Sequence, residues 1–330
     1  MITVRFIKTR ETDKLILRKL KGGDVMKSLS IHLTDQCNNS CKFCVVDSHQ
    51  GKPERVARNI IFKFLESNAG KGYESVNIHG GESTIVPEFF EILDKIKELG
   101  YPTVSLQTNA RKLSDMDFAK EVASRNVDLF IVSVHGKDAE MHDYCTSIQG
   151  SFDEAIQGIK NVKSLGKKVR TNTVVCKQNY NYLVDIIDLV MDLGVDHVNI
   201  SAIHPAGKAF KNFHEVTPRL TEIVPAVKNA VDRVVSRGVV VTLEGFPACV
   251  LRDYAKYMIN WDEIHFKLLF HKIILKDYNE YMENETRKQG APCQECVRKN
   301  KCGGVYKEYL HYYGWSEFSP LTEAELIGNK

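Results

Sequence analysis

Three cysteines lie within eight residues near the start of the chain, in the stretch TDQCNNSCKFCVVD. They are Cys37, Cys41 and Cys44, separated by three and two residues. Thiolates at these spacings can hold three corners of an iron–sulfur cubane, which is ordinarily held by four cysteines. Three protein ligands leave one iron open to a substrate or cofactor, as catalytic metal sites do. The alternative is a zinc site completed by His32 or His49, although this cysteine spacing is unusual for zinc.

A second group of cysteines lies close to the carboxyl end of the chain. Cys293, Cys296 and Cys302 occur together in PCQECVRKNKCGG, and Cys249 stands upstream in GFPAC. Four thiolates would form a closed site, which is typical of structural and electron-transferring centres. Zinc is a strong alternative here, because a CxxC pair with two further cysteines is also common in zinc sites.

Both groups lie in a chain whose patterns alternate between strands and helices. Runs rich in β-branched residues predict six strands, at residues 28–33, 75–80, 103–108, 129–134, 169–175 and 197–202. Between them, apolar residues recur at helical spacing in 88–99, 151–165 and 182–193. We expect Ser151 to cap the second of these helices, with Glu154 completing a capping box.

The alternation of strands and helices predicts repeated βαβ units and a parallel sheet. Right-handed crossovers allow either an open doubly wound sheet or a complete or partial barrel, and the pattern alone does not choose between them. In both folds ligands bind at the carboxyl ends of the strands. The first cysteine group directly follows a predicted strand, so we expect it on this face of the molecule.

The stretch CNNSCKFC, with the aromatic Phe43 just before its third cysteine, resembles the signature of the radical S-adenosylmethionine (SAM) superfamily. The resemblance implies a partial (β/α)6 barrel of the TIM type. It also implies a [4Fe–4S] cluster held by Cys37, Cys41 and Cys44, with SAM bound to the fourth iron through its amino and carboxylate groups. SAM would thus fill the position that three cysteines leave open.

Four further motifs support the resemblance, each at the carboxyl end of a predicted strand. HGGES resembles the family's GGE motif, which holds the methionine amino group, and LQTNA resembles the end of the third strand. VSVHG resembles the end of the fourth strand, and NISAIHPAG resembles the sixth strand end, near the adenine. The cofactor-binding residues that the resemblance implies are Phe43, Gly80, Gly81, Glu82, Thr108, Asn109, Ser133 and Ser201.

The second cysteine group resembles the auxiliary-cluster extensions called SPASM and twitch domains. The resemblance implies one auxiliary [4Fe–4S] cluster held by Cys249, Cys293, Cys296 and Cys302. No cysteine follows Cys302, so the shorter twitch form fits better than the SPASM form. The chain would then comprise an N-terminal extension at 1–26, a radical SAM core at 27–215 and a small α+β auxiliary domain at 216–330.

The resemblance implies an enzyme that cleaves SAM reductively to a 5′-deoxyadenosyl radical and takes a hydrogen atom from a peptide or a small metabolite. It also implies an external electron donor such as flavodoxin or ferredoxin. The alternative is a cysteine-rich zinc or electron-transfer module on an α/β barrel. Such a module has no need of GGE and TN motifs at its strand ends, so we favour the enzyme.

The composition limits the binding partners and the cellular compartment that we expect for this protein. The net charge is only +3 with both signs interspersed, which argues against a nucleic-acid partner. We expect no membrane span, because no segment reaches the ~18 apolar residues that one needs. MITVRFIKTRETDK lacks the features of a signal peptide, so we expect a cytoplasmic protein. In a reducing compartment nine cysteines suggest metal or redox chemistry, and we expect Cys145 and Cys176, outside both groups, to be structural.

Overall fold

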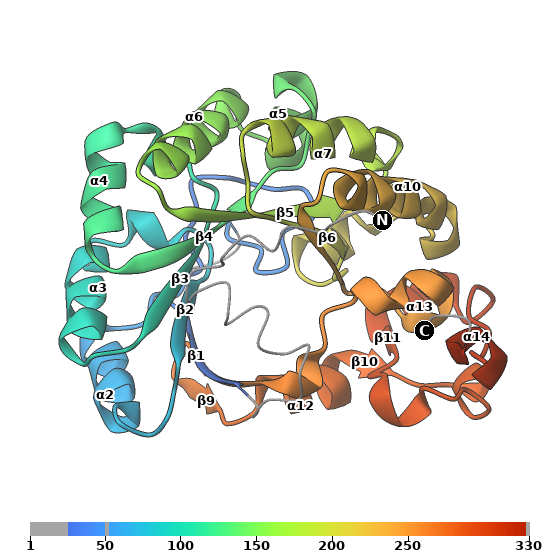
Figure 1. Ribbon diagram of the computed structural model, residues 1–330. Helices are drawn as coiled ribbons and strands as arrows, with labels where there is room; N and C mark the ends of the chain where they lie inside the picture. Colours follow the sequence, from blue (N-terminus) through green and yellow to red (C-terminus); the bar gives the residue numbers. More distant parts are fainter. Residues whose placement is uncertain (1–25, 50–52, 328–330) are drawn as a thin grey trace, which may run out of the picture.

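Eight parallel strands form the centre of the structure, a computed structural model that describes residues 26–49 and 53–327 (Figure 1). With one antiparallel edge strand they make a sheet in the order β7-β6-β5-β4-β3-β2-β1-β8-β9. All six predicted strands are present within two residues of their predicted ends. The strands of the sheet are β1 Met26–His32, β2 Ser75–His79, β3 Thr103–Thr108, β4 Val127–Ser133, β5 Lys168–Val175, β6 His197–Ala202, β7 Val240–Glu244, β8 Ile264–Phe270 and β9 Ile273–Leu275.

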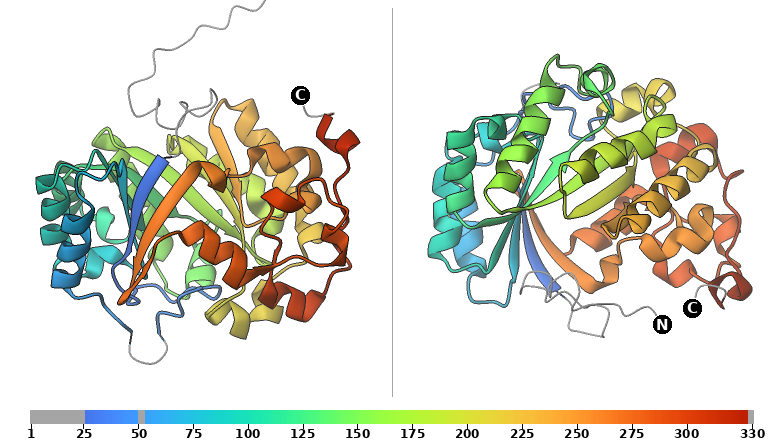
Figure 2. Two further views of the ribbon diagram at one scale, coloured as in Figure 1. Left: turned by 90° about the horizontal axis from the view of Figure 1, so that it is seen from below. Right: turned by 45° about the horizontal axis from the view of Figure 1, so that its top comes forward.

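Helices cover the outer side of this sheet, which curves into a partial barrel (Figures 1 and 2). The open, doubly wound alternative is therefore excluded. The three helices predicted from apolar spacing are α3, α6 and α7, and each lies within one residue of its expected ends. The α-helices are α2 Arg58–Asn68, α3 Phe89–Glu98, α4 Met116–Ser124, α5 Ala139–Thr146, α6 Ser151–Ser164, α7 Leu183–Asp192, α8 Lys208–Lys211, α9 Phe213–Val216, α10 Leu220–Ser236, α11 Ala248–Leu251, α12 Tyr278–Tyr281, α13 Lys307–Tyr313 and α14 Glu323–Ile327.

The two faces of the sheet differ in polarity, because alternate residues of a strand point to opposite faces. On the outer face Leu29, Ile31, Val76 and Ile78 are fully buried under the helices. The residues of the inner face, which encloses the barrel lumen, are in register from strand to strand. Most of these are polar, namely Ser28, Ser30, His32, Ser75, Asn77, His79, Thr103, Ser105, Gln107, Ser133, Arg170, Asn172, Asn199, Ser201, Thr242 and Glu244.

Three strands of the sheet, β7, β8 and β9, come from the part of the chain that follows residue 215. β7 pairs with β6, and β8 pairs with β1, so the chain returns from one edge of the sheet to the other (Figure 2). The sheet therefore continues beyond the boundary at which the sequence pattern changes. The predicted N-terminal extension at 1–26 lies outside the described residues except for Met26, which begins β1.

The C-terminal segment is attached to the barrel through aromatic side chains. The Tyr309 hydroxyl, on α13, accepts a 2.9 Å hydrogen bond from the backbone N–H of Leu220 at the start of α10. The ring of Tyr312 stacks on that of Phe213 at a centroid distance of 4.1 Å. A separate two-stranded sheet, β10 Arg287–Lys288 with β11 Val305–Tyr306, flanks the second cysteine group. Among the described residues, no helix is both long and apolar enough for a membrane span.

Candidate active site

The first cysteine group lies on the loop that follows β1, at the carboxyl ends of the strands, and its three side chains are half-buried. Burial raises the pKa of the Cys37 thiol to about 12, and Glu82 and Cys44 add to the rise. Burial also raises the pKa of Cys41, whose neighbours Cys44 and Cys37 contribute further. Thiols that resist ionisation alone become thiolates beside bound metal cations, so this donor set fits a cationic iron cluster.

Hydrogen-bond donors already face the first of these sulfurs. The backbone N–H of Asn39 donates to Cys37 Sγ at 3.3 Å, and the Asn109 side-chain amide donates to the same atom at 3.8 Å. Hydrogen bonds to sulfur are one of the means by which a protein sets a cluster's reduction potential. Of the two histidines of the zinc alternative, His32 directs its Nε2 to Asp35 and His49 directs its Nε2 to the Asn39 carbonyl.

The cysteine loop is held in place by backbone hydrogen bonds to α5. The backbone N–H of Lys42 donates to the Cys145 carbonyl, and that of Ser40 donates to the Thr146 carbonyl, each at 2.9 Å. Phe43, the residue after Lys42, is buried, and its ring is edge-on to that of His135 at a centroid distance of 4.9 Å. Phe43 therefore anchors the loop in the core, and its predicted contact with the cofactor stays a prediction.

A second support comes from the segment that follows β6. The backbone N–H of Lys208 donates to the Cys44 carbonyl at 2.9 Å, and its Nζ donates to the Ser40 carbonyl at 2.8 Å. Gly207 has a φ of +57°, and a Cβ there would stand 2.3 Å from the Val45 carbonyl oxygen. Only glycine fits such a close approach, so the ends of β1 and β6 are held together through this loop.

The GG turn after β2 lies directly against the start of the cysteine loop. The backbone N–H of Gly81 donates to the Thr34 carbonyl at 2.6 Å, and that of Glu82 donates to the Gln36 carbonyl at 2.8 Å. A Cβ on Gly81 would stand 2.2 Å from the Gln36 carbonyl oxygen, and one on Gly80 would stand 2.5 Å from that of Thr34. These glycines therefore allow two loops to touch along their backbones.

Glu82 is fully buried, and its carboxylate joins the ends of β2 and β3. Oε1 accepts from the hydroxyls of Thr84 at 2.7 Å and Thr108 at 2.8 Å, and Oε2 accepts from the backbone N–H of Asn109 at 2.7 Å. Burial raises the pKa of this carboxyl, while the hydrogen bonds it accepts act in the opposite direction. The structure thus brings four sequence-predicted residues of three motifs, Glu82, Thr108, Asn109 and Cys37, into one connected group.

Arg111 is a positioning residue that the sequence patterns did not reveal. Its Nη1 donates to the Asn38 carbonyl and, at 3.2 Å, to Asn39 Oδ1, so it holds the cysteine loop toward the end of β3. Its Nε donates to Glu154. The predicted capping box is therefore wrong: Gly150 is the N-cap of α6 and makes no side-chain cap, and Glu154 serves the arginine instead. The sequence feature that could have identified Arg111 is its position two residues after Asn109, a predicted cofactor contact.

Ser133 and Ser201, the remaining predicted cofactor contacts, stand on the lumen face of β4 and β6. Ser133 is in register with Asn172 on the neighbouring strand. The Asn172 side-chain oxygen accepts from Ser201 Oγ at 3.1 Å and from the Asn199 amide at 2.7 Å. The Asn199 amide also donates to Glu244 at 3.1 Å. The lumen is therefore lined by a connected set of amide, hydroxyl and carboxylate groups suited to a polar ligand.

All four cysteines of the second group line a single pocket beside the barrel, with apolar walls that include Phe318 and Leu321. Burial raises the pKa of Cys249 to about 12, and Cys302, Cys296 and Cys293 each add to the rise. Although 43 residues lie between Cys249 and Cys293 in the sequence, the fold brings their side chains to the same pocket. The donor set fits a cluster or a zinc ion with four thiolate ligands.

The two remaining cysteines lie in the core, next to the loop that carries the first group. Cys145 and Cys176 are buried, at 1% and 0% exposure, with their sulfurs 4.0 Å apart. They pack with Phe43 and Ile203 in a small apolar cluster. Both are buried packing residues, as expected.

Comparison with known proteins gives three findings. Residues 31–190 match the sequence model of the Radical SAM superfamily. A protein from Saccharolobus islandicus named probable GTP 3′,8-cyclase is 31% identical over 194 residues, which cover 58% of this chain and 62% of that protein. The chain thus spans less than two thirds of that relative's length. A protein of the same name from Sulfurisphaera tokodaii is 29% identical over 214 residues, 64% of this chain and 67% of that protein.

A similar fold is found in SuiB from Streptococcus suis, solved with S-adenosylmethionine bound. The likeness covers 94% of this chain and 80% of that chain, with a TM-score of 0.64 and 16% identity. SuiB bound to its precursor peptide SuiA gives the same TM-score, with coverage of 95% and 79%. The family match includes Cys37, Cys41 and Cys44 and the GG turn that lies against them, and the fold is similar to that of SuiB. Residues 31–190 of this chain are a Radical SAM superfamily domain.

Proposed function

We propose that the chain is an enzyme that reductively cleaves SAM and takes a hydrogen atom from a substrate held in the barrel. One observation carries the proposal. The loop with three cysteines touches the GG turn through backbone hydrogen bonds at Gly81 and Glu82, and the Asn109 amide reaches Cys37 Sγ. A cluster ligand and two cofactor-like strand ends thus form one site. When bound, a [4Fe–4S] cluster and SAM supply one-electron cleavage to methionine and a 5′-deoxyadenosyl radical.

The chain's own residues would bind the cluster and SAM, orient them, and exclude water from the site. Cys37, Cys41 and Cys44 would hold the cluster, and buried Phe43 seats their loop in the core. The remaining residues that we assign to SAM are Gly80, Gly81, Glu82, Thr108, Asn109, Ser133 and Ser201. Their common position at the strand ends supports that assignment. Fixing the donor and acceptor atoms in advance is what selects one hydrogen of the substrate over another.

A polar small molecule is the substrate class that the lumen favours. Asn172, Asn199 and Glu244 offer hydrogen-bonding groups in a connected set, and Arg170 adds a cation 3.7 Å from the Glu244 carboxylate. The relatives named GTP 3′,8-cyclase make GTP the first compound to test. A peptide is the second candidate, because the fold is similar over 95% of the chain to SuiB, which has been solved with a precursor peptide.

We further propose that Cys249, Cys293, Cys296 and Cys302 hold an auxiliary [4Fe–4S] cluster. Their shared pocket supports this, because it brings together four thiolates, the usual ligand set of a [4Fe–4S] cluster. An external one-electron donor such as flavodoxin or ferredoxin would reduce the protein.

The test is an anaerobic assay of the iron-reconstituted protein with SAM and dithionite, in which 5′-deoxyadenosine is measured by mass spectrometry. We expect 5′-deoxyadenosine from the native chain and none from a variant with Cys37, Cys41 and Cys44 all changed to alanine. A chain that carries its clusters but forms none would contradict the proposal. Faster formation with GTP than without, together with a new nucleotide product, would support the nucleotide substrate. If GTP left the rate of 5′-deoxyadenosine formation unchanged, peptides would be tested next as substrates.

A further inference from the structure

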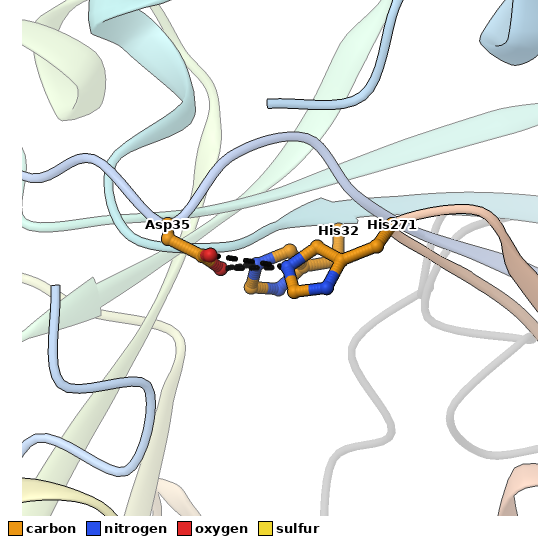
Figure 3. A group of neighbouring side chains, drawn as sticks. All are labelled: His32, Asp35 and His271. Atoms are coloured by element: carbon orange, nitrogen blue, oxygen red, sulfur yellow. Dashed lines mark hydrogen bonds and ion pairs between the residues drawn. The ribbon is translucent and has the colours of Figure 1, made fainter. Parts of the chain in front are cut away.

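Two histidines and an aspartate from three separate segments converge beside the cysteine loop (Figure 3). His32 ends β1, Asp35 lies at the start of the loop, and His271 lies in the turn between β8 and β9. Asp35 Oδ1 stands 2.7 Å from His32 Nε2 and 3.0 Å from His271 Nε2. The three ligand atoms all lie within 4.8 Å of one another. None of these residues belongs to either cysteine group.

These distances are close to those that a shared cation requires. Imidazole nitrogens and carboxylate oxygens bind zinc at about 2.0–2.2 Å, so two of them on one tetrahedral cation stand about 3.4 Å apart, slightly farther than the hydrogen-bonded atoms do here. Both imidazoles already direct Nε2 toward the same carboxylate, as Figure 3 shows. A cation can therefore take the place of the imidazole protons that now lie between these atoms, with little movement of the side chains.

Groups around the cluster hold the ligands in place. Asp35 Oδ2 accepts from the backbone N–H of Glu54 at 3.0 Å, which fixes the carboxylate. The Glu54 carboxylate lies 3.7 Å from His271 Nδ1, the ring nitrogen opposite the one that faces Asp35. A carboxylate behind a histidine is the usual outer partner of a metal-bound imidazole, because it orients the ring and increases its basicity.

The surroundings are also those of a binding site. The side-chain exposures of His32, Asp35 and His271 are 2%, 16% and 24%, so the cluster is shielded but open on one side. The ring of Phe270 lies 4.7 Å from that of His32. His271 has a φ of +51°, in the left-handed region that residues other than glycine rarely adopt. This turn conformation directs the imidazole back toward β1.

We propose that His32, Asp35 and His271 form a binding site for a divalent transition-metal cation, with Zn²⁺ as the cation to test. Two imidazoles and one carboxylate are a ligand set of zinc sites that retain an open coordination position. The cation would tie the end of β1 and the cysteine loop to the β8–β9 turn, which lies more than 200 residues away in the sequence. This site is independent of the proposed SAM chemistry.

The test measures zinc on the protein with its iron clusters in place, so that the cysteines are occupied. After reconstitution, the chain is treated with EDTA, incubated with Zn²⁺, desalted and analysed for zinc and iron by mass spectrometry. We expect about one zinc per native chain, and His271→Ala and Asp35→Asn should each weaken zinc binding by more than the roughly 10–100-fold that loss of an outer partner costs.

His265→Ala is the matched control. His265 lies on β8, the strand that leads into the turn of His271, and its Nδ1 contacts Asp277 at 3.1 Å. This variant therefore loses a histidine–aspartate pair outside the proposed site. We expect it to bind zinc like the native chain. Zinc binding that is undiminished in His271→Ala, or absent from the native chain, would overturn the proposal, whatever the result of the SAM assay.

Discussion

The buried carboxylate of Glu82 accepts a 2.7 Å hydrogen bond from the backbone N–H of Asn109, and this contact joins the ends of β2 and β3. The two motifs that resemble SAM-binding elements are therefore one structural unit. Oε1 of the same carboxylate accepts from Thr84 and Thr108. A group with this many donors around it acts as an acceptor only, so any change that introduces a donor should disturb the whole unit.

Glu82→Gln tests this unit. The new amide would direct its N–H₂ group toward the N–H of Asn109 or the hydroxyl of Thr108, and a buried donor would lose its acceptor. We expect a loss of about 1–3 kcal/mol in the free energy of unfolding, together with weaker SAM binding. Chemical denaturation and calorimetric titration with SAM measure both effects. Glu91→Gln, at a 53% exposed side chain, is the control and should change neither.

Gly81→Ala tests the contact between the GG turn and the cysteine loop. The added Cβ would stand 2.2 Å from the Gln36 carbonyl oxygen, so the loop must move away. We expect the variant to retain much less iron at the first cysteine group. Gly100→Ala is the comparison, because no atom lies within 4 Å of its Cβ and only its φ of +72° is strained. Iron loss of equal extent in both variants would show that the loop contact is not responsible.

The sequence predicts those parts of the site that depend on local spacing. The cysteines, the GG turn and the TN strand end are each short motifs at strand ends, and strand positions follow from β-branched runs. The contacts of Arg111 with Asn38 and of His271 with Asp35 join residues far apart in the sequence, and no local pattern encodes them. The second contact is possible because β8 pairs with β1 in the sheet, although the two strands are far apart in the sequence.

The capping box failed for a related reason. Ser151 and Glu154 have the correct spacing, but Ser151 Oγ hydrogen-bonds to Asp143 at 2.8 Å and Glu154 pairs with Arg111. Both side chains thus interact with residues of other segments, and neither caps the start of α6. Cys249 was a candidate ligand from the sequence only because it is a cysteine, and the structure shows that it lies near the other three.

The first cysteine group should account for half of the iron. Changing Cys37, Cys41 and Cys44 together to alanine should lower the iron content after anaerobic reconstitution from about eight to about four per chain, with sulfide falling in parallel. Cys176→Ala, at a buried cysteine outside both groups, should leave the iron content unchanged. A native chain with about four irons would mean that the C-terminal site holds zinc or nothing.

The second group should be separable from the first. Cys296→Ala should remove the auxiliary iron and leave the catalytic cluster, because the two groups lie on different loops. Cys249→Ala tests the ligand that is distant in sequence, and we expect it to lower auxiliary iron as far as Cys296→Ala does. Iron and zinc analysis of both variants measures this directly. Loss of all iron from either variant would contradict the assignment of two independent sites.

Acid should destabilise the segment beneath the cysteine loop. Burial lowers the pKa of His135 to about 3 and that of His142 to about 4. Nδ1 of His142 accepts from the backbone N–H of His135 at 3.1 Å, and Nδ1 of His135 accepts from that of Val174 at 3.3 Å. Both rings must therefore be neutral in the folded chain, and a proton at either Nδ1 would remove a hydrogen bond to the backbone.

The sign of the pH dependence follows from these shifts. Below the unfolded value of about 6.5 the unfolded chain binds protons that the folded chain does not, so stability is lost as the pH falls from about 6.5 toward 4. Each histidine should remove up to about 1.4 kcal/mol per pH unit in that window. Thermal unfolding between pH 7.5 and 5 measures the loss.

His142→Asn separates this cause from general acid sensitivity. The asparagine Oδ1 can accept the same hydrogen bond from the His135 N–H but does not titrate, so the fall in unfolding temperature with pH should be smaller than in the native chain. His311→Asn, at an exposed position, is the control and should keep the native slope. A His142→Asn variant with the full native slope would place the acid sensitivity elsewhere, since the hydrogen bond would be present and the titrating ring absent.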